Sequence, residues 1–349
     1  MQQLQYIEIN GRTPYECGYE YGLQARDKIL AGVEDYKNVF SKGYGKTWDD
    51  IKAFAMGYLP LLEKELPEEV EEVKGIAAGA GISLADVMVL NCRYEITKFP
   101  KPKECTTAAV MPEAAKEGKT FLFKNWDYRV GIMDNVVVLH ITQPDGSRII
   151  GIGEAGQLLR DGMNTSGVAI VSNNLQSAED SEGIAVPTCF MRRHVLKSKS
   201  FEDACDYIRA FSRRVSCNTM VASADGRAID FEVYPSGADE IVPYKGVLTH
   251  ANHFVVQPKL QILDTSPRDQ RLRELLMKKH SEINVPYIKL CMADHENYPK
   301  AICRHPADPS LELSKRSITV ACEIYDFMAG EAHICSGPPC TGEFRTYKL

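Results

Sequence analysis

Four short segments of this chain carry side chains suited to acyl-transfer chemistry. A thiol, Cys105, opens the segment CTTAAV, and the segments KNWD at 124–127, THANH at 249–253 and KRS at 315–317 follow it. A thiolate can attack a carbonyl carbon, a side-chain amide can stabilise the oxyanion that forms, and carboxylate or guanidinium groups can orient a charged substrate. Each segment taken singly also fits a structural role, because buried thiols and turn-capping aspartates are common.

The order of these residues along the chain is more informative than any single segment. Together with a G-P-P-C run near the end, they give five motifs. These are Cys105-Thr106-Thr107, Asn125-Trp126-Asp127, His250-Ala251-Asn252-His253, Arg316 and Gly337-Pro338-Pro339-Cys340. The set resembles the isopenicillin N acyltransferase-like (acyl-CoA:6-aminopenicillanate acyltransferase) family of N-terminal-nucleophile (Ntn) hydrolases. Intermediate segments such as GMNTSGVAIVSNNL and DHENYPKAICRHP are similar to that family as well. The resemblance therefore covers nearly the whole chain.

The resemblance implies that the chain cleaves itself before the nucleophile, at the bond between Glu104 and Cys105. Residues 1–104 would then form a mostly helical α chain and 105–349 a β chain, the two together making one Ntn-hydrolase domain. A thiol with a pKa near 8.5 needs a base at neutral pH, and a freed α-amino group has a pKa of roughly 7.7 to 8.0. One residue would thus supply both the nucleophile and its base.

Further roles follow from the resemblance alone. Asp127 would orient the amino group or contact a substrate amine, and the side-chain amide of Asn252 would donate a hydrogen bond to the oxyanion. Arg316 would hold a substrate carboxylate, for which its planar guanidinium is suited, or would help to shape the pocket. A second oxyanion donor would come from the backbone after the nucleophile, or from Asn173 or Asn174.

This sequence departs from the family pattern at three positions. Glu104 stands where a glycine often precedes the cysteine, and a glycine tolerates strained backbone geometry better. Lys124, expected to lie in the substrate site, replaces the arginine that commonly precedes N-W-D, and Lys315 stands where a small hydroxyl residue often precedes Arg316.

We therefore interpret the chain as a self-processing cysteine Ntn amidohydrolase or acyltransferase. It would act on a small linear amide or N-acyl amino compound through a thioester on Cys105, without a cofactor. An acyl-CoA-dependent N-acyltransferase is the alternative within this chemistry, with acyl-CoA as cosubstrate. An unprocessed, non-catalytic binding protein of the same fold is the alternative of another class.

A papain-like protease is a further alternative, because His250 and Asn252 follow Cys105 by roughly 145 residues, near the papain spacing. The C-G-S-C-W neighbourhood of that family is absent, and Cys105 precedes a strand-forming run instead of opening a helix. Loss of all turnover on mutation of His250 would favour this alternative.

The elements that must position these residues change in kind at Cys105. Apolar residues recur at helical spacing through most of the first hundred residues, with Thr47 and Asp50 placed to cap one helix and Pro67 to start another. From Cys105 onward, short β-branched runs alternate with turns such as Asp225-Gly226, two helices follow near 187–214, and helices at 267–293 precede the last strands. This order predicts an α+β fold, and the resemblance implies a four-layer αββα sandwich of antiparallel sheets covered by helices.

Composition limits the partners. The 349 residues are 44% hydrophobic, and the chain has 41 Lys and Arg against 47 Asp and Glu, giving a net charge of -6. A globular protein without affinity for nucleic acid is expected, and no apolar run is long enough to span a membrane. We expect a cytoplasmic location, since the final Tyr347-Lys348-Leu349 has a bulky residue where the peroxisomal Ser-Lys-Leu signal needs a small one. The expected partners are a small amide or acyl donor and the other half of an α/β heterodimer, with homo-oligomers left open.

The eleven cysteines form no C-x-x-C pair. In a long chain without a secretory signal, most of them are expected to be buried, reduced thiols. The densest group of metal-ligand types is Cys291, His295, Cys303 and His305, whose spacing fits no common zinc module. No metal site is therefore predicted.

Overall fold

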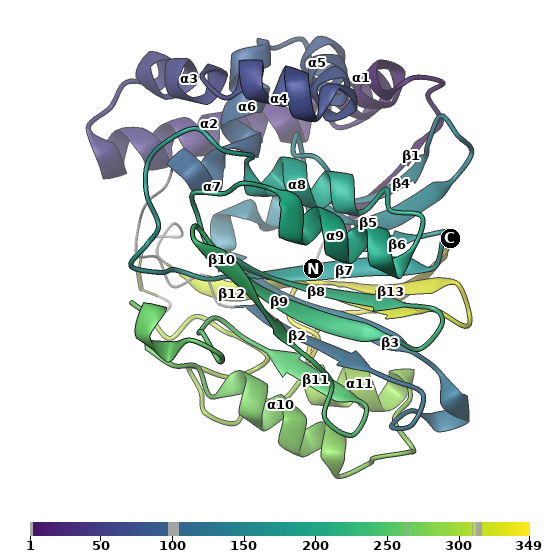
Figure 1. Cartoon of the computed structure of the whole chain (residues 1–349). Helices are drawn as coiled ribbons and strands as arrows, with labels where there is room; N and C mark the ends of the chain where they lie inside the picture. The colour runs from purple at the N-terminus through teal and green to yellow at the C-terminus, as the bar shows by residue number, and fades with distance from the viewer. Residues whose placement is uncertain (1–2, 97–104, 263, 309, 312–315) are drawn as a thin grey trace.

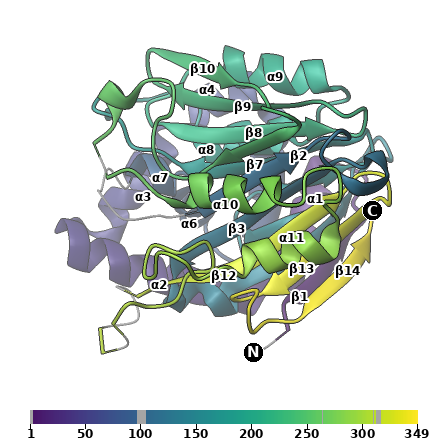
Figure 2. The ribbon, with the colours of Figure 1, turned by 90° about the horizontal axis from the view of Figure 1, so that it is seen from below.

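The computed structural model describes residues 3–96, 105–262, 264–308, 310–311 and 316–349. It has four layers, confirming the predicted αββα sandwich (Figure 1). Helices of the N-terminal third and of the middle of the chain cover an eight-stranded sheet, which packs on a six-stranded sheet. Two later helices cover the outer face of the six-stranded sheet, as Figure 2 shows from below.

The upper helices and their bounds are α1 (Pro14–Gln24), α2 (Arg26–Tyr44), α3 (Trp48–Met56), α4 (Leu59–Glu65), α5 (Pro67–Ala80), α6 (Leu84–Asn91), α7 (Arg93–Ile96), α8 (Thr188–Val195) and α9 (Phe201–Ala210). The lower helices are α10 (Arg268–Met277) and α11 (Val285–Met292). Short 3₁₀ helices lie at Lys116–Gly118, Val130–Asn135 and Pro258–Leu260.

The eight-stranded sheet has the order β1-β4-β5-β6-β7-β8-β9-β10, and the six-stranded sheet the order β11-β2-β3-β12-β13-β14. The strands of the first are β1 (Gln5–Ile9), β4 (Val136–Thr142), β5 (Arg148–Glu154), β6 (Gly162–Asn164), β7 (Val168–Asn174), β8 (Cys217–Ser223), β9 (Ala228–Tyr234) and β10 (Gly237–Ile241). Those of the second are β2 (Cys105–Val110), β3 (Phe121–Arg129), β11 (Val247–His250), β12 (Ser317–Asp326), β13 (Glu331–Ser336) and β14 (Phe344–Lys348).

Local sequence signals explain several of these boundaries. Thr47 and Asp50 form the predicted capping box at the start of α3, and Pro67 opens α5 with two glutamates in its first turn. Such caps satisfy amide groups that lack a partner within the helix. Gly226 takes a positive φ of 87° in the predicted hairpin between β8 and β9.

The prediction was wrong at the two ends of the chain. The segment Gln5–Ile9 was read within a helical region but forms β1, which pairs with β4 in parallel while all other paired strands run antiparallel. Ile7 and Ile9 alternate with exposed residues, so a short amphipathic strand can be recognised only once β4 provides its partner. The last strand, β14, was not predicted either.

Three apolar layers separate the four structural layers, because successive residues of a strand point to opposite faces. On β2, Ala108 and Val110 pack against α10 and α11, whereas Cys105 and Ala109 face the space between the sheets. The third layer joins the eight-stranded sheet to the upper helices. This alternation directs the thiol into the centre of the sandwich.

The segment before Cys105 contributes β1 to a sheet and much of the apolar layer under the upper helices. The division into chains 1–104 and 105–349 stays a prediction. Within the described part of the chain, no helix has both the length and the apolar character required to cross a membrane.

Candidate active site

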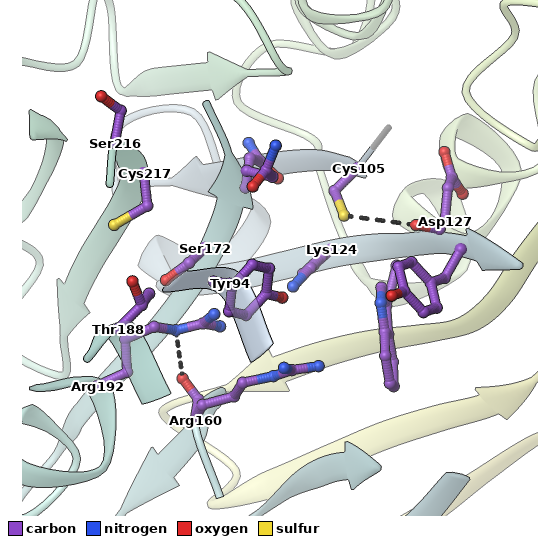
Figure 3. A pocket seen from close by; sticks show the side chains of 14 residues that line it. Tyr94, Cys105, Lys124, Asp127, Arg160, Ser172, Thr188, Arg192, Ser216 and Cys217 are labelled. Atoms are coloured by element: carbon purple, nitrogen blue, oxygen red, sulfur yellow. Dashed lines mark hydrogen bonds between the residues drawn. The ribbon is translucent and has the colours of Figure 1, made fainter. Parts of the chain in front are cut away.

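Cys105 is the first residue of β2, which lies between β11 and β3 in the six-stranded sheet. Only 6% of its surface is exposed, and its sulfur points into a small cavity between the two sheets (Figure 3). Cys105 pairs with Trp126 of β3 on one side, whereas the pairing of β2 with β11 ends at Thr107.

The main-chain nitrogen of Cys105 begins a hydrogen-bonded network. It donates to Asn252 Oδ1 at 2.7 Å, and Arg268 Nη2 donates to the same oxygen at 2.7 Å. Arg268 Nη1 lies 3.5 Å from Asp127 Oδ2, and the Thr319 hydroxyl donates to Asp127 Oδ1 at 2.6 Å. Of the two predicted residues, Asn252 therefore contacts the backbone of Cys105 directly, and Arg268 links Asp127 to Asn252.

Sequence reasoning missed Arg268, which is 1% exposed at the first position of α10. No motif surrounds it, and only its position after Pro267 marks it as the start of a helix. Burial moves the Asp127–Arg268 pair toward its neutral forms: it raises the pKa of Asp127 to about 7, although Arg268 opposes this, and lowers the pKa of Arg268.

Burial also raises the pKa of the Cys105 thiol, an effect that the nearby Lys124 ammonium reduces. The sulfur lies 3.9 Å from the main-chain oxygen of Asp127. The thiol is therefore protonated at neutral pH and needs a proton acceptor before it can attack a carbonyl group.

No histidine is among the described residues that line the cavity. Both ring nitrogens of His250 are engaged, Nε2 with Glu232 at 2.8 Å and Nδ1 with the main-chain oxygen of Ala251 at 2.8 Å. Burial alone would lower the pKa of His250, but Asp230 and Glu232 raise it to about 9. This geometry contradicts the papain-like alternative, because His250 interacts with the carboxylates of β9 and does not contact the Cys105 thiol.

The cavity wall is rich in cations. Its described lining comes from α7, β2, β3, β7, α8, the start of β8 and the segments before β6 and β8. Lys124, Arg160 and Arg192 line it, and Asp161 accepts from Lys124 Nζ at 2.6 Å and pairs with Arg192. Arg160 also stacks on Trp126, with 5.2 Å from its guanidinium carbon to the ring centroid. Sequence reasoning had singled out Lys124 but not Arg160.

The two asparagines at the end of β7 differ in their contacts. Asn173 donates to the Thr107 hydroxyl at 2.8 Å. Asn252 Nδ2, the predicted oxyanion donor, instead donates to the main-chain oxygen of Asn174 at 2.8 Å. The side-chain nitrogen of Asn174 is buried and has no hydrogen-bond partner in the described structure. Since Asn174 lines the cavity, its amide nitrogen is a donor available to a ligand.

Arg316 is not among the residues that line this cavity. It lies just before β12, and its Nε donates to the main-chain oxygen of Leu311. Its predicted contact with a substrate carboxylate stays a prediction. Glu104 of the predicted cleavage site and Lys315 lie outside the described residues.

Comparison with known proteins places this chain in a family. Residues 114–340 match the model of a family described as "Acyl-coenzyme A:6-aminopenicillanic acid acyl-transferase". This chain belongs to that family. The membership expected from the motifs is thereby confirmed. An Emericella nidulans protein, "Acyl-coenzyme A:6-aminopenicillanic-acid-acyltransferase 40 kDa form", is 26% identical over 94% of this chain and 91% of its own length.

Two solved structures show a looser similarity. A Caenorhabditis elegans ortholog of N-acylethanolamine-hydrolyzing acid amidase is 12% identical over 64% of this chain and 93% of its own, with a TM-score of 0.48. Penicillin V acylase from Agrobacterium tumefaciens is 13% identical over 70% of this chain and 86% of its own, also with a TM-score of 0.48.

The substitution Asn174→Ala should separate catalysis from stability. We expect a loss of about 100- to 1000-fold in kcat for amide turnover, the usual cost of removing one oxyanion donor. The melting temperature should stay near the wild-type value, because the lost amide nitrogen has no partner. Steady-state kinetics and thermal unfolding measure both.

The control for this test is Asn164→Ala. Asn164 donates to the main-chain oxygens of Leu196 and Ser198, both at 2.9 Å, and does not line the cavity. It should lose stability and keep its kcat. A normal kcat for Asn174→Ala would refute the oxyanion role.

Asp127 should make folding stability depend on pH. Its folded-state pKa of about 7 exceeds the ordinary 3.8, so between these values the folded chain keeps a proton that the unfolded chain releases. The resulting stability is complete below pH 4 and is lost as the pH rises through 7. Relative to Asp127→Asn, the protein with Asp127 should lose on the order of 2 kcal/mol of unfolding free energy between pH 5 and pH 8.

Both proteins are best compared in a Cys105→Ala background, where self-cleavage cannot differ between them. Urea unfolding at several pH values gives the two curves. Parallel curves would show that Asp127 titrates near its ordinary pKa.

Proposed function

We propose that this protein is a self-processing cysteine Ntn enzyme that cleaves small linear amides through a thioester on Cys105. The observation that supports this most is the contact between the main-chain nitrogen of Cys105 and Asn252 Oδ1, at 2.7 Å. Cleavage of the preceding peptide bond would turn this nitrogen into an amino group that is already held beside the thiol.

The released amine would complete the catalytic pair. With a pKa of roughly 7.7 to 8.0 it accepts the thiol proton at neutral pH, and the thiolate attacks the substrate carbonyl carbon. The side-chain amide of Asn174 stabilises the oxyanion. The ammonium group then returns its proton to the departing amine, which leaves the acyl group on the sulfur until water or another amine takes it.

The charges of the cavity favour a substrate with an anionic group. Lys124, Arg160 and Arg192 line the cavity, and the carboxylate of Asp161 lies among them. Two other carboxyl groups nearby, Asp127 and Glu323, have pKa values that burial raises to about 7 and about 8, so they carry less negative charge at neutral pH. A guanidinium binds a carboxylate in bidentate geometry, and Arg160 borders the cavity, whereas Arg316 does not. We therefore assign the substrate contact to Arg160, with an N-acyl amino acid as the simplest matching class.

Self-processing is tested by intact-mass measurement of wild type and Cys105→Ala. Wild type should give two pieces, 1–104 and 105–349, and Cys105→Ala a single chain. Cys217→Ala is the matched control, since Cys217 is a second buried thiol of the same cavity and should leave processing intact. A wild-type chain that stays whole yet cleaves amides would refute the need for a free amino group. One that stays whole and is inactive would support the binding-protein alternative.

Acyl transfer is the second candidate reaction, favoured by the acyltransferase description of the 26% identical relative. Both reactions share the acyl-enzyme, and water at about 55 M competes with any amine for it. With an acyl-CoA donor and a millimolar amine, we expect the free carboxylic acid as the main product, measured by mass spectrometry. Cys105→Ala should form neither product, and a predominance of the new amide would identify an acyltransferase.

A further inference from the structure

A second group of reactive side chains lies apart from the cavity. Four residues each offer one potential ligand atom, and these four atoms all lie within 4.8 Å of one another: they belong to His295, Cys303, His305 and Cys340. None of the four lines the cavity around Cys105. They belong to two segments, the loop after α11 and the turn after β13.

The separations between these atoms are close to those of a tetrahedral metal site. His305 Nε2 lies 3.7 Å from Cys303 Sγ and 3.2 Å from Cys340 Sγ, and the His295 and His305 ring centroids are 5.1 Å apart. Zinc bonds of about 2.3 Å to sulfur and 2.0–2.1 Å to nitrogen place tetrahedral ligand atoms roughly 3.3–3.8 Å apart. Closing the widest gap requires a movement of only about 1 Å.

We propose that His295, Cys303, His305 and Cys340 bind one zinc ion in a structural Cys₂His₂ site. Two thiolates and two imidazoles are the ligand set that selects zinc in tetrahedral geometry. All four positions are filled by protein, so the site has no open position for catalysis. His295 is exposed and Cys340 partly so, which gives the ion a path from solvent.

The sequence pattern had pointed to a different set. Cys291 was grouped with His295, Cys303 and His305, but it is 2% exposed in the apolar layer between α11 and the six-stranded sheet. Its place is taken by Cys340, the last residue of the G-P-P-C motif. The spacing thus fitted no zinc module because the fourth ligand comes from a distant segment.

The position of this site gives the ion a role. The main-chain nitrogen of Arg304, between two of the ligands, donates to the Thr319 hydroxyl at 2.8 Å, and that hydroxyl donates to Asp127 at 2.6 Å. On the other segment, Gly337 donates through its main-chain nitrogen to Val320 at 2.9 Å. Zinc would therefore join the two segments that flank the start of β12 and would hold Thr319 against Asp127.

The test uses the full chain, reduced and freed of metal, and titrated with Co²⁺ as a spectroscopic probe for zinc. We expect about one equivalent to bind, with thiolate-to-cobalt charge-transfer bands and tetrahedral d–d bands, and about one zinc ion per chain in protein from zinc-supplemented medium. Cys340→Ser and His295→Asn should lose these bands and most of the metal. Chelation should lower the melting temperature of wild type but not of these variants.

The matched controls are Cys291→Ser and His280→Asn, which should keep the metal and the bands. No cobalt uptake by the reduced chain would overturn the proposal. So would a Cys303–Cys340 disulfide in the freshly purified protein together with weak uptake after reduction, because the two thiols would then be a redox pair. Metal that persists in both Cys340→Ser and His295→Asn would place it elsewhere and equally overturn the assignment.

Discussion

The hydrogen bond between the main-chain nitrogen of Cys105 and Asn252 is the contact on which the candidate active site depends. Cys105 opens a central strand, so its nitrogen lies where the regular sheet pairing ends and a side chain must provide the acceptor. Asn252 meets that need and is itself held by Arg268. The contact satisfies a buried amide group in the intact chain and would hold an amino group after cleavage.

Burial makes this arrangement costly. Asp127 and Arg268 lie together almost without solvent, and removing a charge from water is unfavourable unless a partner and hydrogen bonds compensate for it. Arg268 compensates Asp127, while Thr319 and Asn252 provide neutral hydrogen bonds. Because burial raises the pKa of Asp127 to about 7, the protonation state of this carboxyl group changes near neutral pH.

The same network reaches beyond the cavity. Thr319 exchanges two hydrogen bonds with the backbone of Arg304, and Asn125 donates to the main-chain oxygens of Met292 and Ile302. The N-W-D motif thus fastens the loop after α11 to the face of β3 opposite the thiol. The two polar residues of the H-x-N-H motif also have different contacts. His250 bonds to Glu232 of the other sheet, while Asn252 accepts a hydrogen bond from the main-chain nitrogen of Cys105. In each motif, one residue therefore stabilises the fold, Asn125 or His250, and another, Asp127 or Asn252, belongs to the network around Cys105.

The sequence by itself determined the family and the layered fold, since these depend on residue types in fixed order and on local periodicity, and it singled out Cys105 as the proposed nucleophile. Helix caps such as Thr47 and Ser200 act within a few residues, so they could be predicted as well. Only the tertiary structure showed which distant residues contact one another. Arg268 bonds to Asn252, Arg160 lines the cavity, and Cys340 lies next to His305. The parallel pairing of β1 with β4 also became visible only there. These contacts join residues far apart in the chain, where spacing carries no signal because sheet register and helix packing bring them together.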